Sequence, residues 1–229
     1  MKNLNKKSEQ SKATIKALLS QWDAELPKSI IEKQKKISSR RLFLGQSIGL
    51  MGSLTLSSAV VAKIQDNSKV FNTLKQPWIS LSEVQEHLFP RIGDINIKGS
   101  EFSPGAKDIN AIQYLQTMLS TPDADSDESK FIIKGVEWLD GVANSMANRP
   151  FKKLDYSMRE KVLKKISASE SGENWLSMLL RYIFEALLAD PVYGGNTNSM
   201  GWKWLEHQPG FPRPPEDKKY WMLKGKGLA

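Results

Sequence analysis

The chain has 229 residues, with 33 Lys or Arg, 25 Asp or Glu and no cysteine. Without cysteine it cannot form a disulfide, a thiolate-bound zinc or iron–sulfur site, or a haem attachment through Cys-x-x-Cys-His. Its formal net charge of +8 is concentrated at one end, because residues 1–41 alone carry eleven basic and four acidic side chains. The remaining residues are nearly neutral, which removes the electrostatic basis for binding nucleic acid.

The basic segment of residues 1–41 also contains apolar residues at helical spacing, and Pro27 closes the pattern. Two interpretations are open. One is a fluctuating tail with accidental periodicity, which we favour as the simpler. The other is an amphipathic helix that contacts the membrane surface or a partner before export. The apolar residues are Ile15, Leu18, Leu19, Trp22 and Leu26.

An adjacent arginine pair then precedes an uncharged, weakly apolar run over residues 42–62. This arrangement predicts a twin-arginine export signal, a route that carries folded proteins. The run contains too many serine and glycine residues to be as apolar as a membrane-spanning helix. It also lacks the charged face that an amphipathic core helix would have. The predicted signal residues are Ser39, Arg40, Arg41, Phe43 and Leu44.

The small residues that end at Ala62 predict cleavage there, and retention as an uncleaved anchor is the alternative. We therefore divide the chain into a signal region, residues 1–62, and a domain, residues 63–229. The signal region consists of the basic segment 1–41 and the apolar segment 42–62. About 167 residues are left for the domain, enough for one hydrophobic core.

The domain shows the periodicity of a compact, mainly α fold with about five helices. Capping boxes predict that the first helix begins at Ser80 and the fourth at Ser157. The second and third helices are predicted over residues 106–120 and 129–147. The residues expected to face the core are Leu81, Val84, Leu88, Ile109, Ile112, Leu115, Leu119, Ile132, Val136, Leu139, Ala143, Met146, Val162, Leu163 and Ile166.

Between the second and third helices, residues 121–127 form an acidic stretch that we interpret as a solvated loop. Asp123, Asp125 and Asp127 resemble the start of a calcium-binding loop. The glycine and the distal glutamate that such a loop requires are missing at the usual offsets. Calcium binding is therefore only a minor alternative.

The fifth predicted helix, residues 175–188, is apolar at most positions, and only Ser177, Arg181 and Glu185 form a polar line. A helix with so wide an apolar surface must be covered on most sides. It is either the central helix of the domain, which is the simpler interpretation, or a helix partly covered by another protein.

Beyond this helix the chain becomes irregular and rich in Pro and Gly. A Gly-Gly turn and nearby aromatic residues indicate either a sharp chain reversal with local packing or a protein interface. The candidate partner-interface residues are Tyr193, Gly194, Gly195, Asn196, Gly201, Trp202 and Phe211.

Catalysis by this chain alone is not expected. It has only two histidines, His87 and His207, far apart in the sequence. No Ser-His-Asp spacing stands out, and no glycine-rich nucleotide motif follows a predicted strand. We therefore assign no catalytic, cofactor-binding or metal-binding residue to it.

The C-terminal part of the chain contains a pattern made of residues 184–196, Gly201-Trp202 and Gly210-Phe211-Pro212. Residues 88–90, residues 150–154 and the arginine pair add to it. Together these segments resemble the gluconate 2-dehydrogenase subunit 3 family. It spans about residues 40–213. The long lysine-rich leader and the insertion of residues 205–209 depart from the family pattern, and the insertion leaves the geometry of that loop open.

The resemblance implies a non-catalytic small, or gamma, subunit of a periplasmic, membrane-associated dehydrogenase of sugars or sugar acids. FAD would lie in a large subunit of the GMC type, and a multihaem cytochrome c subunit would take the electrons onward. This chain would supply the signal for the twin-arginine translocase and stabilise the flavoprotein. The alternatives are a free-standing periplasmic chaperone or binding module and, least favoured, a self-sufficient enzyme.

Overall fold

The structure is a computed structural model that describes residues 2–33, 77–93 and 102–223. The predicted export signal, with Ser39, Arg40, Arg41, Phe43 and Leu44, lies outside these residues, as does the predicted cleavage site at Ala62. Both therefore stay predictions.

The described residues form helices and no strand, apart from a single antiparallel bridge between Ile92 and Ser103. This confirms the mainly α fold. Four short 3₁₀ turns connect the α-helices: η1 (Phe151–Lys153), η2 (Pro191–Tyr193), η3 (Thr197–Ser199) and η4 (Glu216–Lys218). The α-helices are α1 (Lys2–Ala24), α4 (Trp78–Leu88), α5 (Ala111–Leu119), α6 (Ser126–Ala147), α7 (Tyr156–Ile166), α8 (Glu170–Leu188), α9 (Met200–Trp204) and α10 (Tyr220–Leu223).

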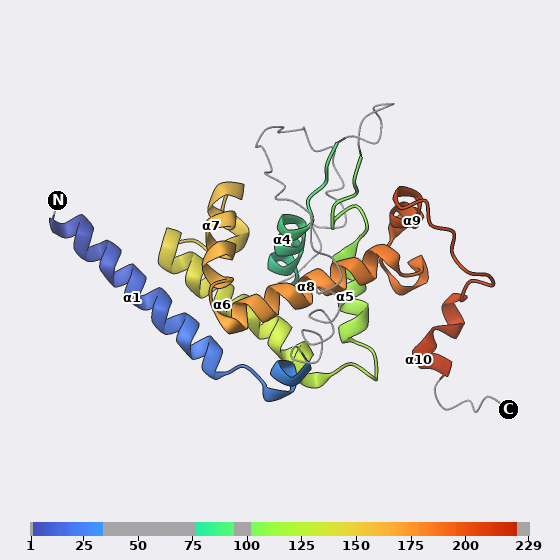
Figure 1. The fold of residues 1–229 in the computed structure, drawn as a ribbon, viewed down its shortest axis with the longest axis horizontal. Helices are drawn as coiled ribbons and strands as arrows, with labels where there is room; N and C mark the ends of the chain where they lie inside the picture. The colour runs from blue at the N-terminus through green and yellow to red at the C-terminus, as the bar shows by residue number, and fades with distance from the viewer. Residues whose placement is uncertain (1, 34–76, 94–101, 224–229) are drawn as a thin grey trace, which may run out of the picture.

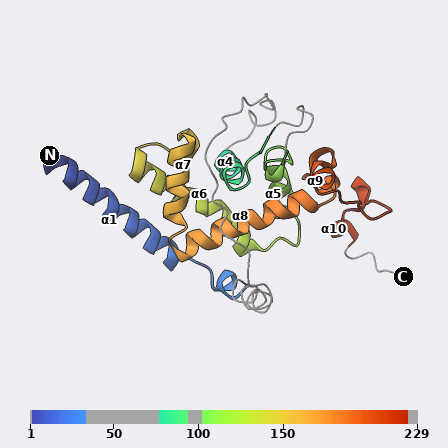
Figure 2. The same ribbon diagram turned by 45° about the horizontal axis from the view of Figure 1, so that its top comes forward.

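Helix α8 crosses the middle of the molecule, with α4, α5, α6 and α7 arranged beside it (Figure 1). Helix α1 lies at one end of the molecule, whereas α9 and α10 lie at the other, and the turned view keeps this order (Figure 2). Elements that are far apart in the sequence therefore meet at each end of α8.

One side of α8 lies in the core of the domain along most of the helix. Trp175, Leu179 and Ile183 are fully buried. The indole Nε1 of Trp175 donates a hydrogen bond to the backbone oxygen of Ile132 on α6, at 3.0 Å. The indole approaches α6 so closely that a Cβ at Gly135 would overlap it. These contacts confirm the interpretation of the fifth predicted helix as the central one.

The two predicted capping boxes are wrong. Helix α4 begins at Trp78 after Pro77, without a side-chain cap. Helix α7 begins at Tyr156, and the Asp155 carboxylate caps it by accepting a hydrogen bond from the Met158 N–H at 2.8 Å. An aspartate both accepts this bond and interacts favourably with the helix dipole, so it takes precedence over the serine two residues later.

Other helix boundaries also differ from the prediction. Helix α6 begins at Ser126 because Asp125, from the acidic stretch, accepts hydrogen bonds from the Asp127 and Glu128 N–H groups at 2.9 and 3.2 Å. Helix α8 begins at Glu170, capped by the Ser169 hydroxyl. The solvated-loop interpretation is therefore wrong for residues 125–127, since Asp125 caps α6 and the other two belong to the helix or its first turn.

Helix α5 is shorter than predicted, because residues 106–110 form turns and Asn110 adopts a left-handed conformation with φ 56° before the helix begins. Ala106 and Ile109 are nevertheless buried. The apolar pattern thus identified core residues correctly here, although it overestimated the length of the helix.

The favoured interpretation of residues 1–41 as a fluctuating tail is wrong for the described part. Helix α1 is regular, and it packs against α6 and α8. Trp22 is only 1% exposed, and Ile15, Leu26 and Ile30 are also buried. Tertiary contacts to residues far along the chain stabilise this helix, and sequence periodicity alone does not show such contacts. The amphipathic helix is thus confirmed, whereas its contact with a membrane or partner stays a prediction.

None of the helices in the described part of the chain is both long enough and apolar enough to cross a membrane.

Candidate functional site

Five apolar side chains form an open surface at the C-terminal end of α8, which we call the aromatic patch. Phe184 is 46% exposed and Trp204 37%, and Leu188 and Leu205 are exposed as well. The half-buried ring of Phe89 joins them, since its centroid lies 6.1 Å from that of Phe184 and 6.4 Å from that of Trp204. The patch therefore combines the ends of α4, α8 and α9.

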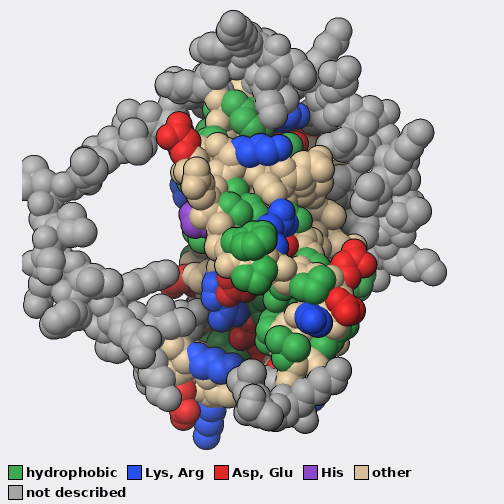
Figure 3. Space-filling model, turned by 90° about the vertical axis from the view of Figure 1, so that its right-hand side faces the viewer, with side chains coloured by type: hydrophobic (Ala, Val, Ile, Leu, Met, Phe, Trp, Pro, Cys, Tyr) green, Lys and Arg blue, Asp and Glu red, His purple; other side chains and the backbone are tan. Residues whose placement is uncertain are grey.

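The sequence of α8 explains why this surface is open. Phe184 and Leu188 are four residues apart, so they lie on one side of the helix, one turn from each other. The adjacent Ile183 and Leu187 point into the core and are buried. The apolar circumference of α8 is thus largely covered by its own domain, and Phe184 and Leu188 are the large apolar positions left exposed. Figure 3 shows the end of the molecule that carries α9 and α10, where hydrophobic side chains gather between charged ones.

The loop after α8 holds α9 in place through Asn196, whose side chain is fully buried. Its Oδ1 accepts a hydrogen bond from the Gly201 N–H at 2.8 Å, and its Nδ2 donates one to the Ala189 carbonyl at 3.0 Å. The Trp202 indole donates to the Leu188 carbonyl at 2.8 Å. The last carbonyls of a helix lack partners within the helix. Asn196 and Trp202 supply partners for two carbonyls at this end of α8, and they thereby fix the position of Trp204 and Leu205.

Glycine is required at two positions of this loop. Gly194 has a φ of 94°, in the left-handed region, and a Cβ at Gly201 would overlap the Leu187 carbonyl. Asn196 also adopts a left-handed conformation, with φ 47°. The Gly-Gly-Asn segment is therefore a sharp chain reversal packed onto α8, and asparagine tolerates this backbone conformation better than most residues do.

The residues predicted for the partner interface lie in different environments. Gly195, Asn196, Gly201 and Trp202 are buried, so they support the loop from inside. Gly194 is half-buried. Tyr193 is also half-buried, and its ring lies tilted against those of Tyr220 and Trp221, at 6.0 and 5.6 Å between ring centroids. Phe211 is 95% exposed. Contact of these residues with a partner stays a prediction, and the accessible part of the set is chiefly Phe211.

Sequence reasoning missed the patch residues as site candidates, although one signal pointed to two of them. The apolar circumference of the fifth predicted helix left open its partial coverage by another protein, and Phe184 and Leu188 are the positions left uncovered. Phe89, Trp204 and Leu205 come from two other elements, and only the fold brings them beside α8.

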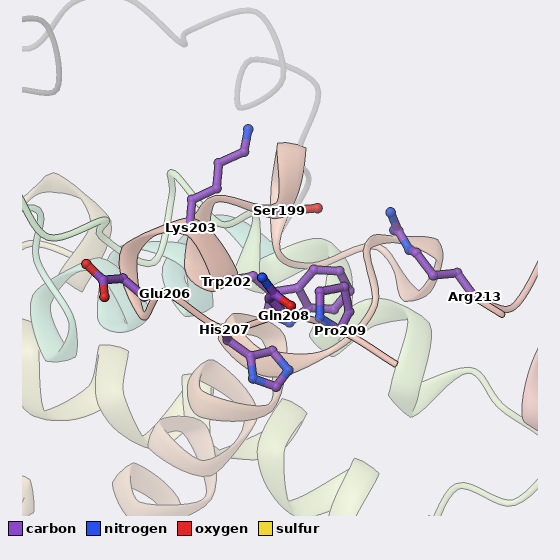
Figure 4. A pocket seen from close by; sticks show the side chains of 8 residues that line it. All are labelled: Ser199, Trp202, Lys203, Glu206, His207, Gln208, Pro209 and Arg213. Atoms are coloured by element: carbon purple, nitrogen blue, oxygen red, sulfur yellow. The ribbon is translucent and has the colours of Figure 1, made fainter. Parts of the chain in front are cut away.

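A cavity of about 440 Å³ lies next to the patch, beneath α9. Figure 4 shows Lys203, Glu206 and His207 pointing in three different directions, so their charged and polar groups do not converge on one point. The other lining residues are Ser199, Trp202, Gln208, Pro209 and Arg213. The arrangement lacks the convergent acid, base and nucleophile of a catalytic site.

Arg213 at the rim of this cavity already has partners. Its guanidinium donates to both carboxylate oxygens of Asp190, at 2.8 and 3.1 Å, and lies over the Trp202 ring at 5.2 Å. The hydrogen bond from Arg213 lowers the pKa of Asp190. Asp190 also accepts a hydrogen bond from the Val192 N–H at 3.0 Å. The pair ties the Pro-rich tail back onto the start of the loop.

The polar line of α8 also has a structural explanation. The Tyr182 hydroxyl donates to Glu128 on α6 at 2.6 Å, and Arg181 forms an ion pair with the same carboxylate. Burial raises the pKa of Tyr182, and the bond to Glu128 raises it further. Burial likewise raises the pKa of Glu185, which contacts the Tyr114 hydroxyl at 3.4 Å. Glu128 and Tyr182 are buried, whereas Arg181 and Glu185 are partly exposed. Together these polar groups pair across α5, α6 and α8 and anchor the central helix.

The two histidines lie in separate environments. The ring of His87 lies tilted against that of Tyr156, at 4.3 Å between ring centroids, and its Nε2 lies 3.1 Å from the Glu160 carboxylate. His207 lies beside Trp202. Across the described ranges, no group of three or more His, Asp or Glu side chains is arranged to hold a metal ion. The aromatic patch is therefore the candidate functional site, and its chemistry is that of a protein-binding surface.

The family model for gluconate 2-dehydrogenase subunit 3 matches residues 75–210, more than half of the chain. The match contains the whole aromatic patch and the loop that supports it, whereas α1 lies outside it. No curated protein and no solved structure matches the chain.

Proposed function

This chain belongs to the gluconate 2-dehydrogenase subunit 3 family, and we propose that it is the non-catalytic small subunit of an FAD-dependent dehydrogenase of sugars or sugar acids. The proposal places the complex in the periplasm, associated with the inner membrane. The substrate is bound and oxidised in the large subunit, which this chain stabilises.

The observation that carries the proposal is the aromatic patch. A contiguous exposed group of Phe, Trp and Leu side chains is unfavourable in water and marks a site of interaction. Aromatic side chains are also enriched in the buried centres of protein interfaces, where they contribute most of the binding energy. All five residues lie in the region that the family model matches. We infer that this surface binds the large subunit.

In this proposal the oxidation and the electron transfer take place in the other subunits of the complex. FAD would accept hydride from a substrate hydroxyl within the GMC-type partner, and a multihaem cytochrome c subunit would carry the electrons onward. We assign no residue of the pocket beneath α9 to FAD, because the charged and polar groups of Lys203, Glu206 and His207 point in different directions there. The role of the described residues is to hold Phe184, Leu188 and Trp204 in one fixed surface.

The proposed escort role depends on the predicted signal around Arg40 and Arg41. If one signal serves both subunits, replacing Arg40 and Arg41 with lysine leaves this chain and the flavoprotein together in the cytoplasm. Cell fractionation with antibodies to both subunits measures this. A flavoprotein that still reaches the periplasm contradicts the escort role.

Affinity purification from the native cell envelope tests the subunit role itself. The full chain, tagged after Ala229, should bring down a larger protein with the absorption spectrum of a flavin. A double variant, Phe184→Ala with Trp204→Ala, should lose that protein. Tyr156→Ala is the matched control, since it removes an exposed aromatic ring (62% exposed) from α7, away from the patch. A colourless, solitary wild-type chain contradicts the proposal and favours a free-standing periplasmic chaperone or binding module.

A further inference from the structure

Helix α1 occupies a specific binding surface on α6 and α8. Trp22 inserts between three aromatic rings, with its centroid 6.3 Å from Phe131, 6.3 Å from Trp138 and 5.9 Å from Trp175. Leu18 lies against Gly141 of α6. The aromatic rings of α6 and α8 would be open to water if α1 were absent.

Hydrogen bonds define the position of α1 on this surface. The Asp23 carboxylate accepts from the Ser171 N–H at 2.8 Å, in the first turn of α8, where backbone N–H groups lack partners within the helix. The Ser171 hydroxyl donates to the Trp22 carbonyl at 3.0 Å. Near the other end, the Ser11 hydroxyl donates to the Ser145 carbonyl at 2.6 Å. The docking is therefore directional and fixes α1 in one register.

Ion pairs extend the contact beyond the helix. Glu25 pairs with Lys134 on α6, and Lys33 pairs with Asp125 at the start of α6. The opposite side of α1 is polar and exposed, and it includes Lys12, Lys16 and Ser20. The apolar side of α1 is thus already covered by its own domain, so this side is free for a membrane or another protein only after α1 leaves.

The docked position conflicts with the membrane topology of an export signal. Residues 1–41 carry most of the net positive charge of the chain, and such a segment stays on the cytoplasmic side during insertion. The domain after the signal crosses to the other side. Helix α1 and its binding surface on α6 and α8 would then lie on opposite sides of the membrane. Docking of α1 and insertion of the signal therefore exclude each other.

We propose that α1 acts as a reversible brake on export. While α1 is docked on α6 and α8, the folded chain stays in the cytoplasm, and export begins only after α1 has left this surface. The proposal rests on the export signal of the proposed function. One feature of the contact suits release, because the Trp22 Nε1 is buried and has no hydrogen-bond acceptor among the described residues. The delay gives a partner time to bind the aromatic patch, which lies at the far end of α8 and stays accessible while α1 is docked.

Transport of the full chain into inverted inner-membrane vesicles that contain the translocase tests the brake, with protease-protected chain as the readout. Trp22→Ala weakens docking, and its rate of import should rise roughly tenfold, since losing a buried tryptophan shifts such an equilibrium by more than that factor. Ser20→Ala, on the exposed side of α1, is the matched control and should import at the wild-type rate. Equal rates for Trp22→Ala and the wild type overturn the brake.

A tether keeps the test decisive if Trp22→Ala fails to fold. The chain has no cysteine, so a Ser11→Cys, Ser145→Cys double variant can be joined only at that contact by a short bismaleimide. The joined chain should not be imported, whereas the same variant without the reagent should be. Import of the joined chain at the untethered rate overturns the proposal.

Substitution of the arginine pair shows whether a negative result contradicts the brake or the export function on which it rests. Replacing Arg40 and Arg41 with lysine should abolish import in every docking variant. If import survives that change, the export function itself is wrong. If import is abolished by the change but is insensitive to both Trp22→Ala and the tether, only the brake is wrong.

Discussion

Both ends of α8 carry an apolar surface that contains aromatic rings. The surface at one end is covered by another helix of the chain, whereas the surface at the other end is exposed to water. At the N-terminal end, Trp175 meets the buried ring of Trp22 at 5.9 Å between centroids, and α1 covers the surface. At the C-terminal end, Phe184 meets Phe89 and remains 46% exposed. The first end is closed by the chain itself, whereas the second is left open.

This difference indicates which surface is available for a stable partner. Both ends contain aromatic rings in edge-to-face contact, a favourable geometry in cores and in interfaces alike. Only at the open end do these rings remain in contact with water, and only that end lies wholly in the region that the family model matches. The closed end depends on α1, which lies outside the match. We therefore assign stable subunit binding to the open end and reversible cis docking to the closed one.

The largest expected effect on the free energy of unfolding comes from removing the buried Trp175 ring at the closed end of α8. Trp175→Ala removes a fully buried ring and its hydrogen bond to Ile132. It should lower the free energy of unfolding by about 3–5 kcal/mol. Urea unfolding followed by circular dichroism measures the loss. Trp204→Ala, at the open end, is the matched control and should cost about 1 kcal/mol or less. Equal losses at the two ends would contradict the comparison.

The next effect tests whether α1 belongs to the core. Trp22→Ala should cost about 3 kcal/mol, because Trp22 is 1% exposed and contacts three aromatic rings. Its indole N–H has no hydrogen bond to lose, so the loss should be smaller than that at Trp175. The same urea titration measures it. A loss below about 0.5 kcal/mol, typical of a surface substitution, would mean that α1 is not part of the folded core.

The next prediction concerns Asn196, which holds the loop that supports the aromatic patch at the open end of α8. Asn196→Ala removes both hydrogen bonds that hold the loop, to the Gly201 N–H and the Ala189 carbonyl. It should cost about 2 kcal/mol, because buried backbone groups lose their partners. It should also weaken partner binding, since Trp204 would no longer be held in place. Thermal unfolding and co-purification measure the two effects, and unchanged binding despite the lost stability would show that the loop does not position the patch.

The open surface itself should matter for binding more than for folding. Phe184→Ala should change the free energy of unfolding by about 1 kcal/mol or less, because the ring is half-exposed. Its binding to the large subunit should weaken about tenfold, as is common for an aromatic residue in an interface. Titration of the purified subunits gives both dissociation constants. Wild-type affinity in this variant would remove Phe184 from the interface.

The smallest effect is a pH dependence confined to the open end. The hydrogen bond from Arg213 lowers the pKa of Asp190, although burial slightly opposes this. A carboxyl with a lowered folded pKa contributes stability above its unfolded pKa, about 3.9 for Asp, and loses it as the pH falls through the folded value. The tail should therefore stay attached at neutral pH and detach only below about pH 4. Hydrogen exchange of residues 205–223 measures this attachment, and Asp190→Asn should remove its acid dependence.

The sequence predicted the parts of the fold that periodicity controls. Leu81, Val84, Ile132, Leu139 and Ile166 were predicted to face the core and are fully buried. Helix starts were less predictable. The cap Asp155 lies two residues before the predicted start at Ser157, and the cap Asp125 lies four residues before the predicted start at residue 129. The backbone conformation decides between such neighbours, and the sequence pattern does not contain it.

The binding surfaces required the fold itself. The helix that contains Trp22 was disfavoured because its stability comes from Trp138 and Trp175, more than 100 residues further along the chain. The aromatic patch needs α4, α8 and α9 to meet. Leu205 lies in the insertion whose loop geometry the sequence left open, and Trp204 immediately precedes it. Long-range contacts of this kind are absent from any local pattern, so both surfaces had to come from the structure.

The most direct test of this account is hydrogen exchange of the full chain, measured alone and in complex with the flavoprotein. Peptides that contain Phe89, residues 184–188 and residues 202–205 should exchange more slowly in the complex than in the chain alone. Peptides of α1 around Trp22 should already be protected in the chain alone. Unchanged exchange at the aromatic patch in a stable complex would contradict the assignment of the open end as the partner surface.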